Sequence, residues 1–503
     1  MIYIDGGTLD IKKLRHIAES MEKVGITEET RRRIMKSRDS LMNLVSSGAN
    51  IYGVNTGFGS LLNVRIKPDK IEDLQRNLIR SHSAGVGEPL DKKHVRSIMA
   101  IRANSLCKGF SGVSVELIEK ILEFLNEDIY PYVPRFGSVG ASGDLAPLAH
   151  IGLCLMGEGY VLSDQIRVET SKCLAKKSIE PYQFKSKESI SFINGTATIT
   201  GILSLETGRA IDLLKFSLGS ASMSFESLKG TRKAFESWAV GARPHQGQIK
   251  IAMNMGKILA DSAICELSER TKVQDAYSLR CIPQVYGAVF DTIRYVKSIV
   301  EVEMNSATDN PLVNDEEFVS AGNFHGEPVA FASDFIAIAL CDLGNMIERR
   351  IARITDEKLS GLPPFLVKDS GLNSGYMIAQ YTAAALCNRN KTLANPSSTD
   401  TIPTCANQED HVSMGANSAI KLIELIDNLQ EIISIEYVLA SQALDLLEEV
   451  PCPFNESLRI TIRETIDHLH KDRPIFKDIE KMSEMMMKSE RFRDIISLID
   501  LDL

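Results

Sequence analysis

Residues 416–449 read ANSAIKLIELIDNLQEIISIEYVLASQALDLLEE, and their apolar side chains recur at spacings of three and four. The stripe consists of Leu422, Ile426, Leu429, Ile433, Tyr437, Ala440 and Leu444. This period predicts an amphipathic α-helix, and Pro451 and Pro453 mark its end. A helix of about 34 residues is roughly 50 Å long at 1.5 Å per residue.

Two further segments carry long helical patterns. Residues 283–303 place Val285, Val289, Ile293, Val296 and Val300 on one stripe. Residues 334–354 begin apolar on almost every side (FIAIALC), which predicts a helix buried among other helices. Several parallel rods of this kind predict an all-α, mainly helical protein. Its long central bundle is expected to pack against other subunits.

The N-terminal part has a different pattern. Shorter helices are predicted over residues 8–22, 27–46, 92–108 and 115–127, and Gly-rich loops that are candidates for an active site separate them. The polar, Lys-rich stretch 163–188 predicts a surface connection or a hairpin. We therefore predict an N-terminal region over residues 1–195, followed by the long-helix bundle and a C-terminal helical region over 196–503.

Composition excludes several classes of function. The chain has 57 basic and 66 acidic residues, a net charge of −9, which argues against a nucleic-acid partner or an anionic membrane surface. The apolar run 335–341 ends at Asp342, far short of the roughly 20 residues of a membrane span. The N-terminus lacks a signal-peptide pattern. Nine scattered cysteines without a CxxC pair indicate reduced thiols in a cytoplasmic protein.

The most informative loop is GSVGASGDLAPLAH, residues 137–150. One interpretation is a tight turn into a helix, with Asp144 as its cap. A phosphate cradle is disfavoured, because neither a P-loop nor a GxGxxG spacing is present. A third interpretation is chemical: with small residues on both sides of Ser142, the amide of Gly143 can attack the carbonyl two residues back. Loss of water would then leave an electrophilic ring, which composition and spacing permit without establishing it.

Many motifs in one order resemble the aromatic amino acid ammonia-lyases and aminomutases, which use 4-methylidene-imidazol-5-one (MIO). Besides the loop at 137–150, they are IDGGTLDIKKLRHIA (4–18), YGVNTGFG (52–59), RSHSAGVGEPL (80–90), FINGTA (192–197), ARPHQGQ (242–248), QDAYSLRCIPQV (274–285), NSATDNPL (305–312), GNFHGEPVA (322–330), GLNSGYMIAQ (371–380) and ANQEDHVSMG (406–415). The resemblance covers essentially the whole chain. It implies that Ala141, Ser142 and Gly143 form MIO, so that no external cofactor is needed.

Elimination of ammonia needs help at two atoms. The amino group leaves poorly, which an electrophile bonded to its nitrogen remedies, and the β-proton needs a positioned base. The resemblance implies that Tyr52 is this base and that the guanidinium fork of Arg280 binds the substrate carboxylate. It also implies contacts to the electrophile or amino group from Asn194 and Tyr277, and further substrate contacts from Gln274 and Phe324. Asp144 is expected to assist ring closure during maturation.

Two residues bear on the substrate ring. His82, in a Ser-His order, resembles the histidine-directed pattern, although some tyrosine aminomutases share it. Glu409 stands where phenylalanine- and tyrosine-directed relatives usually carry a neutral amide, and a carboxylate suits an imidazole. L-Histidine is therefore the expected substrate, with trans-urocanate and ammonia as products, the first step of histidine degradation. Arg389, where an acidic residue is expected, and Cys405, where Ser is common, depart from the pattern.

Several alternatives stay open at this point. A tyrosine-directed ammonia-lyase or 2,3-aminomutase would use the same electrophile, and a non-catalytic helical assembly protein would keep only the fold. No metal site is expected, because the spacing of His150, His245, His325 and His411 matches no zinc-binding pattern. The resemblance implies a homotetramer whose active sites draw residues from three chains.

Overall fold

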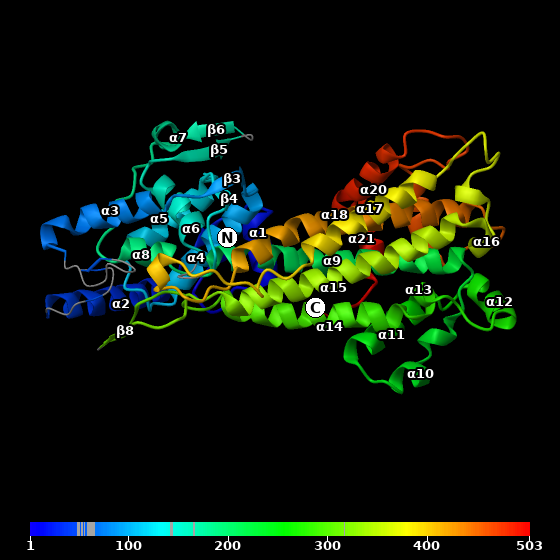
Figure 1. Cartoon of the computed structure of the whole chain (residues 1–503), viewed down its shortest axis with the longest axis horizontal. Helices are drawn as coiled ribbons and strands as arrows, with labels where there is room; N and C mark the ends of the chain where they lie inside the picture. The colour runs from blue at the N-terminus through cyan, green and yellow to red at the C-terminus, as the bar shows by residue number, and fades with distance from the viewer. Residues whose placement is uncertain are drawn as a thin grey trace. The chain divides into compact units, whose positions relative to one another are not determined.

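The computed structural model describes residues 1–47, 51, 54, 56–57, 66–140, 144–163, 166–315 and 317–502 (Figure 1). Helices dominate these residues, and the strands form only two-stranded ladders. The predicted all-α class is therefore confirmed, whereas the tetramer stays a prediction.

The chain forms two compact units, each built from separate segments. The first contains Met1–Gly208, Val296–Asp334 and Pro396–Leu422, and the second contains Arg209–Tyr295, Phe335–Asn395 and Ile423–Leu503. Compactness does not test whether residues 1–195 form a region of their own, so the predicted boundary after residue 195 stays a prediction.

The first unit holds the strands and the shorter helices of the N-terminal part. Its helices are α1 (Ile11–Ala18), α2 (Glu28–Ser46), α3 (Ile71–His82), α4 (Lys92–Cys107), α5 (Val115–Asn126), α6 (Leu145–Leu155), α7 (Thr170–Lys177) and α8 (Glu188–Ile193). Its strands are β1 (Ile2–Tyr3), β2 (Val24–Gly25), β3 (Val86–Pro89), β4 (Pro134–Phe136), β5 (Tyr160–Ser163), β6 (Ile166–Glu169), β7 (Leu312–Val313) and β8 (Phe318–Val319). The antiparallel pair β5–β6 only overlaps the start of residues 163–188, where a surface connection or a hairpin was predicted, because β5 begins at Tyr160.

The second unit contains helices and no strand among the described residues. Its own helices are α10 (Ser237–Gly241), α11 (Gln246–Ile258), α12 (Ala263–Thr271), α13 (Tyr277–Arg280), α16 (Glu357–Ser360), α17 (Met377–Leu393), α19 (Pro453–Arg463), α20 (Phe476–Lys488) and α21 (Glu490–Ser497). Four long helices have residues in both units: α9 (Ala197–Ser227), α14 (Ile282–Glu303), α15 (Glu327–Thr355) and α18 (Gly415–Asp445).

Helix α4 lies at the centre of the first unit, between α1, α2 and α5. Every residue from His94 to Cys107 is buried, including two arginines. The guanidinium of Arg96 donates to the carbonyl oxygens of Ile17 (2.9 Å) and Leu125 (2.8 Å), in the last turns of α1 and α5. A cation at helix C-termini satisfies carbonyls that the helices leave open, so Arg96 fastens both ends to α4.

A buried ion pair organises the core of the second unit. Arg350 of α15 and Glu436 of α18 are fully buried, with 2.6 Å between Nε and Oε1. The Tyr286 hydroxyl of α14 lies 2.6 Å from the same guanidinium, and the Ser224 hydroxyl of α9 donates to Glu436. This network therefore links all four long helices. Because each charge is paired and hydrogen-bonded, these interactions offset much of the free energy lost when the charged groups are removed from water.

The predicted long helices are confirmed, and α9 is a helix that its sequence pattern did not reveal. Residues 416–449, 283–303 and 334–354 correspond to α18, α14 and most of α15. Helix α9 contains many buried serines and threonines, and their hydroxyls donate to carbonyls three or four residues earlier, as Ser204 does to Thr200. These hydrogen bonds allow polar residues to be buried in the helix. The apolar residues therefore do not recur clearly at spacings of three and four, and the sequence pattern of a helix is weakened.

Helix α15 alone, among the described residues, is long and apolar enough to cross a membrane by length and composition. Two thirds of its most apolar window (67%) is buried against the rest of the protein, as in the core helix of a globular fold.

Candidate active site

Asp144, the residue directly after Ala141–Gly143, caps a distant helix. Its Oδ2 accepts hydrogen bonds from the backbone N–H groups of Thr198 (2.8 Å) and Ile199 (3.0 Å), in the first turn of α9. Its Oδ1 accepts the Ser138 hydroxyl at 3.1 Å. The helix that directly follows, α6, receives no side-chain bond from it. The interpretation as a cap was thus right in kind, but the helix is α9, which supplies orphan N–H donors and a favourable dipole.

Burial sets the protonation of this carboxyl group. Loss of hydration raises the pKa of Asp144 to about 7, outweighing the bonds from Ile199, Ser138 and Thr198, which lower it. The carboxylate therefore changes charge near neutral pH, directly beside the predicted ring-forming tripeptide. Ala141, Ser142 and Gly143 themselves lie outside the described residues.

Asn194 approaches the same loop from α8. The backbone N–H of Asp144 donates to the carbonyl of Gly195 at 2.7 Å, so residues 194–195 lie against the end of the loop. The Asn194 amide donates to the carbonyl of Asn310 at 3.0 Å, whereas its buried Oδ1 has no partner among the described residues. A buried amide oxygen without a partner is costly, so a donor from outside the described residues is expected there.

His82, the last residue of α3, is oriented through its Nδ1, which lies 2.9 Å from the Leu78 carbonyl oxygen and 3.0 Å from the Ser81 hydroxyl. Because a carbonyl can only accept, the Leu78 contact favours the tautomer with the proton on Nδ1 and Nε2 as an acceptor. Burial lowers the pKa of His82, while the Leu78 carbonyl and the Glu409 carboxylate raise it in part. The structure thus brings the two predicted specificity residues within electrostatic reach, with the imidazole biased toward its neutral form.

Glu409 is held by a turn that the sequence analysis did not single out. The Thr404 hydroxyl donates to Glu409 Oε2 at 2.5 Å, and the two residues also form a backbone bridge. Between them, Cys405, Ala406 and Asn407 all have positive φ angles, of 49°, 53° and 64°. Three left-handed residues in a row are costly and persist only where the surroundings require them. The ANQED motif shows an acidic residue, but only the fold shows that Thr404 positions it.

Two segments that carry predicted substrate contacts converge on Gly140, just before the predicted ring-forming tripeptide in the sequence. Gly326, two residues after the half-buried Phe324, donates its N–H to the Gly140 carbonyl at 3.3 Å. The Ser413 hydroxyl, four residues after Glu409, donates to the same oxygen at 3.1 Å. A Cβ on Gly140, whose φ is +71°, would lie 2.1 Å from that hydroxyl, so only glycine fits.

The second unit contains three further predicted site residues, Gln274, Tyr277 and Arg280. The guanidinium of Arg280 donates to the Gln274 side-chain oxygen at 2.8 Å and lies 4.7 Å from the centre of the Tyr277 ring. Tyr277 is 71% exposed. The structure therefore brings Gln274, Tyr277 and Arg280 together at the surface of this unit, on and beside α13.

Tyr52 lies outside the described residues, but its surroundings along the chain are anchored. Ile51 and Val54 are fully buried in a small apolar cluster with Leu41 and Val313.

Arg389, the departure from the expected pattern, forms an ion pair on the surface of the second unit. Its Nε and Nη2 donate to the two carboxylate oxygens of Glu424 at 2.6 and 3.0 Å, and both side chains are about half exposed. This bond occupies the guanidinium with a neighbouring helix and supports an indirect role for Arg389.

Comparison with known proteins shows which family the chain resembles in sequence. The model of the aromatic amino acid lyases matches residues 9–464. A probable histidine ammonia-lyase of Thermoplasma acidophilum is 55% identical over 490 residues, 97% of this chain and 99% of the relative.

Solved structures agree with the sequence match. The fold is similar to a tyrosine aminomutase from Streptomyces globisporus (TM-score 0.94, 38% identity, 98% of both chains). It is also similar to a histidine ammonia-lyase from Trypanosoma cruzi (TM-score 0.91, 37% identity, 99% of this chain and 95% of that chain). The chain belongs to the aromatic amino acid lyase family.

Proposed function

We propose that the protein is a histidine ammonia-lyase, which converts L-histidine to trans-urocanate and ammonia without oxidation. The observation that carries the choice of substrate is the pair of His82, with Nε2 free to accept, and the Glu409 carboxylate. The imidazole ring of the substrate can donate an N–H to either group, whereas an unsubstituted phenyl ring has no donor to offer the carboxylate. The curated relatives named histidine ammonia-lyase support the same substrate.

MIO formed from Ala141, Ser142 and Gly143 is the proposed prosthetic group, without an external cofactor. The described surroundings fit such a ring: the Asn194 Oδ1 is buried without a described partner, and Asp144 titrates near neutral pH beside the tripeptide. MIO supplies an electrophilic carbon for the substrate nitrogen. We assign Asn194 to hold this region by hydrogen bonding and Asp144 to assist ring closure by exchanging a proton.

The remaining roles concern the substrate. Tyr52 removes the β-proton as the Cα–N bond breaks, so the carbon skeleton becomes urocanate and the nitrogen is released as ammonia. Arg280, oriented by Gln274, binds the carboxylate, and Tyr277 and Phe324 complete the contacts. The depressed pKa of His82 keeps Nε2 available to accept from the substrate imidazole.

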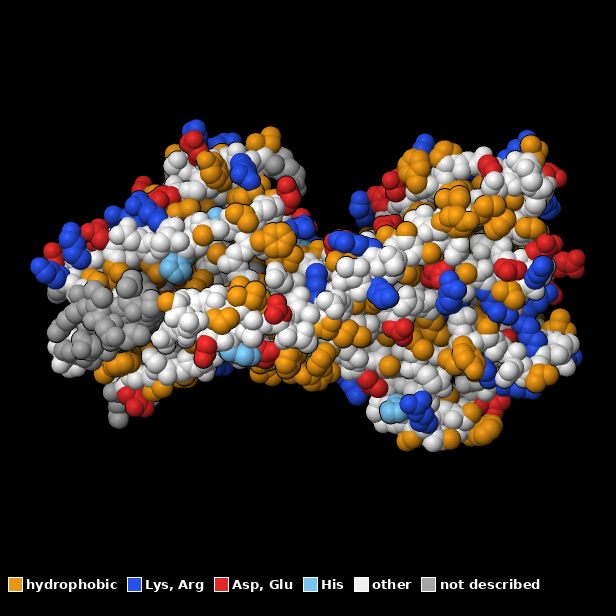
Figure 2. All heavy atoms as spheres, in the orientation of Figure 1, with side chains coloured by type: hydrophobic (Ala, Val, Ile, Leu, Met, Phe, Trp, Pro, Cys, Tyr) orange, Lys and Arg blue, Asp and Glu red, His pale blue; other side chains and the backbone are white. Residues whose placement is uncertain are grey.

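A homotetramer is the proposed assembly, in a cytoplasmic enzyme without nucleic-acid or membrane partners. Large apolar side chains are exposed on the second unit: Tyr295 (46%), Phe335 (44%), Ile338 (48%), Ile378 (60%) and Tyr381 (59%). On the face that Figure 2 shows, exposed hydrophobic side chains lie among the charged ones. Exposed apolar surface of this kind is typical of subunit interfaces.

Turnover of L-histidine and L-tyrosine, assayed separately, tests the proposed substrate. L-Histidine should give urocanate and ammonia, and L-tyrosine should give neither coumarate nor β-tyrosine at a comparable rate. Preferential formation of β-tyrosine would instead establish an aminomutase.

Coexpression of two chains with impaired activity tests the shared site. Glu409→Gln and Arg280→Ala alter different units, so mixed tetramers should regain activity well above either parent if one site takes residues from several chains. Activity no higher than the parents would contradict a shared site.

A further inference from the structure

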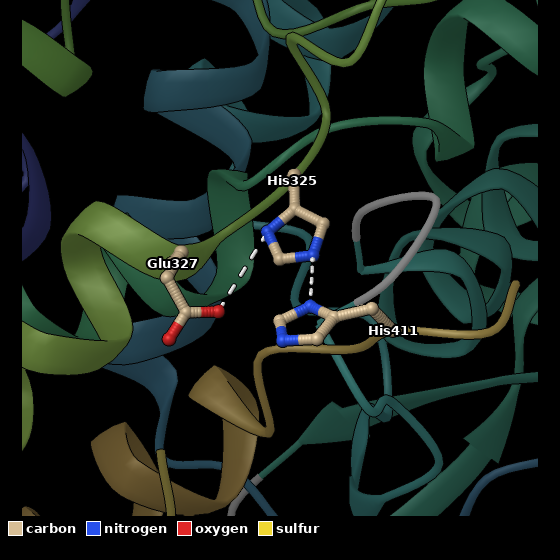
Figure 3. Close-up of side chains that lie close together, drawn as sticks. All are labelled: His325, Glu327 and His411. Carbon is tan, nitrogen blue, oxygen red and sulfur yellow. Dashed lines mark hydrogen bonds and ion pairs between the residues drawn. The ribbon is translucent and has the colours of Figure 1, made fainter. Parts of the chain in front are cut away.

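Three side chains from two distant segments meet beside the proposed active site. His325 and Glu327 belong to the segment that enters α15, and His411 lies 86 residues further along the chain. The Nε2 of His325 lies 3.3 Å from the Nδ1 of His411, and its Nδ1 lies 3.9 Å from Oε2 of Glu327. In Figure 3 dashed lines join the two ring nitrogens of His325 to different partners, one to the Glu327 carboxylate and the other to the His411 ring.

We propose that His325, Glu327 and His411 form a binding site for a late first-row divalent metal ion such as Zn²⁺ or Co²⁺. One ligand atom from each residue can be chosen so that all lie within 4.8 Å of one another. Ligands at about 2.1 Å from zinc are roughly 3.4 Å apart in a tetrahedron, close to the 3.3 Å between the two imidazole nitrogens. Rotation of the Glu327 side chain toward these two nitrogens would complete the set.

The chemistry of the donors selects the class of metal. Two imidazole nitrogens and one carboxylate favour Zn²⁺, Co²⁺ or Ni²⁺ over Mg²⁺ and Ca²⁺, which prefer all-oxygen sets. Glu327 Oε2 is buried and has no hydrogen-bond partner among the described residues, so a cation would satisfy it. His411 is exposed, which leaves a further coordination position open to water or a small ligand.

The backbone holds the ligands in place. The N–H of His325 donates to the Gly322 carbonyl at 2.9 Å, and the N–H of Val412 donates to the Thr401 hydroxyl at 2.9 Å. Both segments then bond to the Gly140 carbonyl, through Gly326 and Ser413. A metal bound here would tie the segment of Phe324 to that of Glu409.

Cobalt binding tests the proposal directly. The untagged protein is stripped with a chelator and titrated with Co²⁺ alone, because L-histidine itself chelates metals. Bound cobalt is measured by its visible ligand-field absorption and by elemental analysis after gel filtration. We expect one Co²⁺ per chain, displaced by Zn²⁺.

Single variants assign the ligands. His325→Ala, Glu327→Gln and His411→Ala should each weaken cobalt binding by more than about tenfold, since even the outer partners of ligands contribute that much. His16→Ala, an exposed histidine on α1, is the matched control and should bind as the wild type does. Thermal melts of each variant report folding separately.

The proposal is overturned by either of two results. One is a wild type that retains no cobalt after gel filtration, which would leave the two imidazoles as a hydrogen-bonded pair. The other is a set of variants that bind cobalt as the His16→Ala control does. Because no substrate is present, neither result depends on the proposed reaction.

Discussion

The two groups of predicted site residues differ in how complete they are within one chain. In the first unit, Asp144 and Asn194 are buried, and His82 and Glu409 are fixed by Leu78 and Thr404. In the second unit, Gln274, Tyr277 and Arg280 contact one another but lie at its surface, with Tyr277 71% exposed. The first group is therefore preorganised by its own fold, whereas the second lies on a surface that the proposed assembly with other copies would cover.

The largest expected effect concerns the buried acid of the first unit. A carboxyl group whose pKa rises from 3.8 to about 7 on folding binds more protons in the folded state, so wild-type stability falls as pH rises from about 4 to about 7. Asp144→Asn removes this dependence. Relative to wild type, the free energy of unfolding of the variant should rise by up to about 4 kcal/mol across that range. Denaturant unfolding at several pH values measures it, and parallel pH curves would contradict it.

Glu409→Gln tests the substrate-facing side of the first unit. Loss of a charged acceptor should lower kcat/KM for L-histidine by about 10- to 100-fold, as expected when a hydrogen bond to a charged group is weakened. Activity with L-tyrosine should not fall in parallel. Glu424→Gln, on the surface of the second unit, is the control. An equal loss with both substrates would point to general damage and not to specificity.

Arg280→Lys tests the exposed group of the second unit. A lysine keeps the charge but loses the two-pronged geometry, so KM for L-histidine should rise by roughly tenfold while kcat changes less. Arg294→Lys, which alters a surface pair with Asp291 and a contact with the Phe290 ring, is the matched control. An unchanged KM would remove Arg280 from carboxylate binding.

Thr404→Val should have the smallest effect. The substitution keeps the shape and removes the hydroxyl that orients Glu409, a bond worth about 1 kcal/mol, so kcat/KM for L-histidine should fall by roughly fivefold. Thr399→Val, whose hydroxyl donates only to a nearby carbonyl, should leave it unchanged. Equal behaviour of the two variants would show that Thr404 has no positioning role.

Local sequence rules predicted helices with caps and clear stripes. Helix α2 begins after Thr27, whose hydroxyl accepts from the N–H of Thr30, and it ends at Ser46 as expected. Helix α9 was not predicted, because its buried serines interrupt the regular recurrence of apolar residues. Motifs likewise pointed to Asp144 and Glu409, but not to their partners in α9 and at Thr404.

Contacts between distant segments mark the limit of sequence reasoning. His325 and His411 are 86 residues apart, so no spacing rule reveals that their rings stack with centres 5.4 Å apart. The division of predicted site residues between two units was equally hidden, because each motif shows only its own neighbours along the chain.

The most direct test of the account is the intact mass of the wild type beside Ser142→Ala. If Ala141, Ser142 and Gly143 close into MIO, the wild type is lighter than its sequence requires by two water molecules. The variant then has its full calculated mass and almost no turnover of L-histidine. A fully active wild type with the unmodified mass would contradict the account.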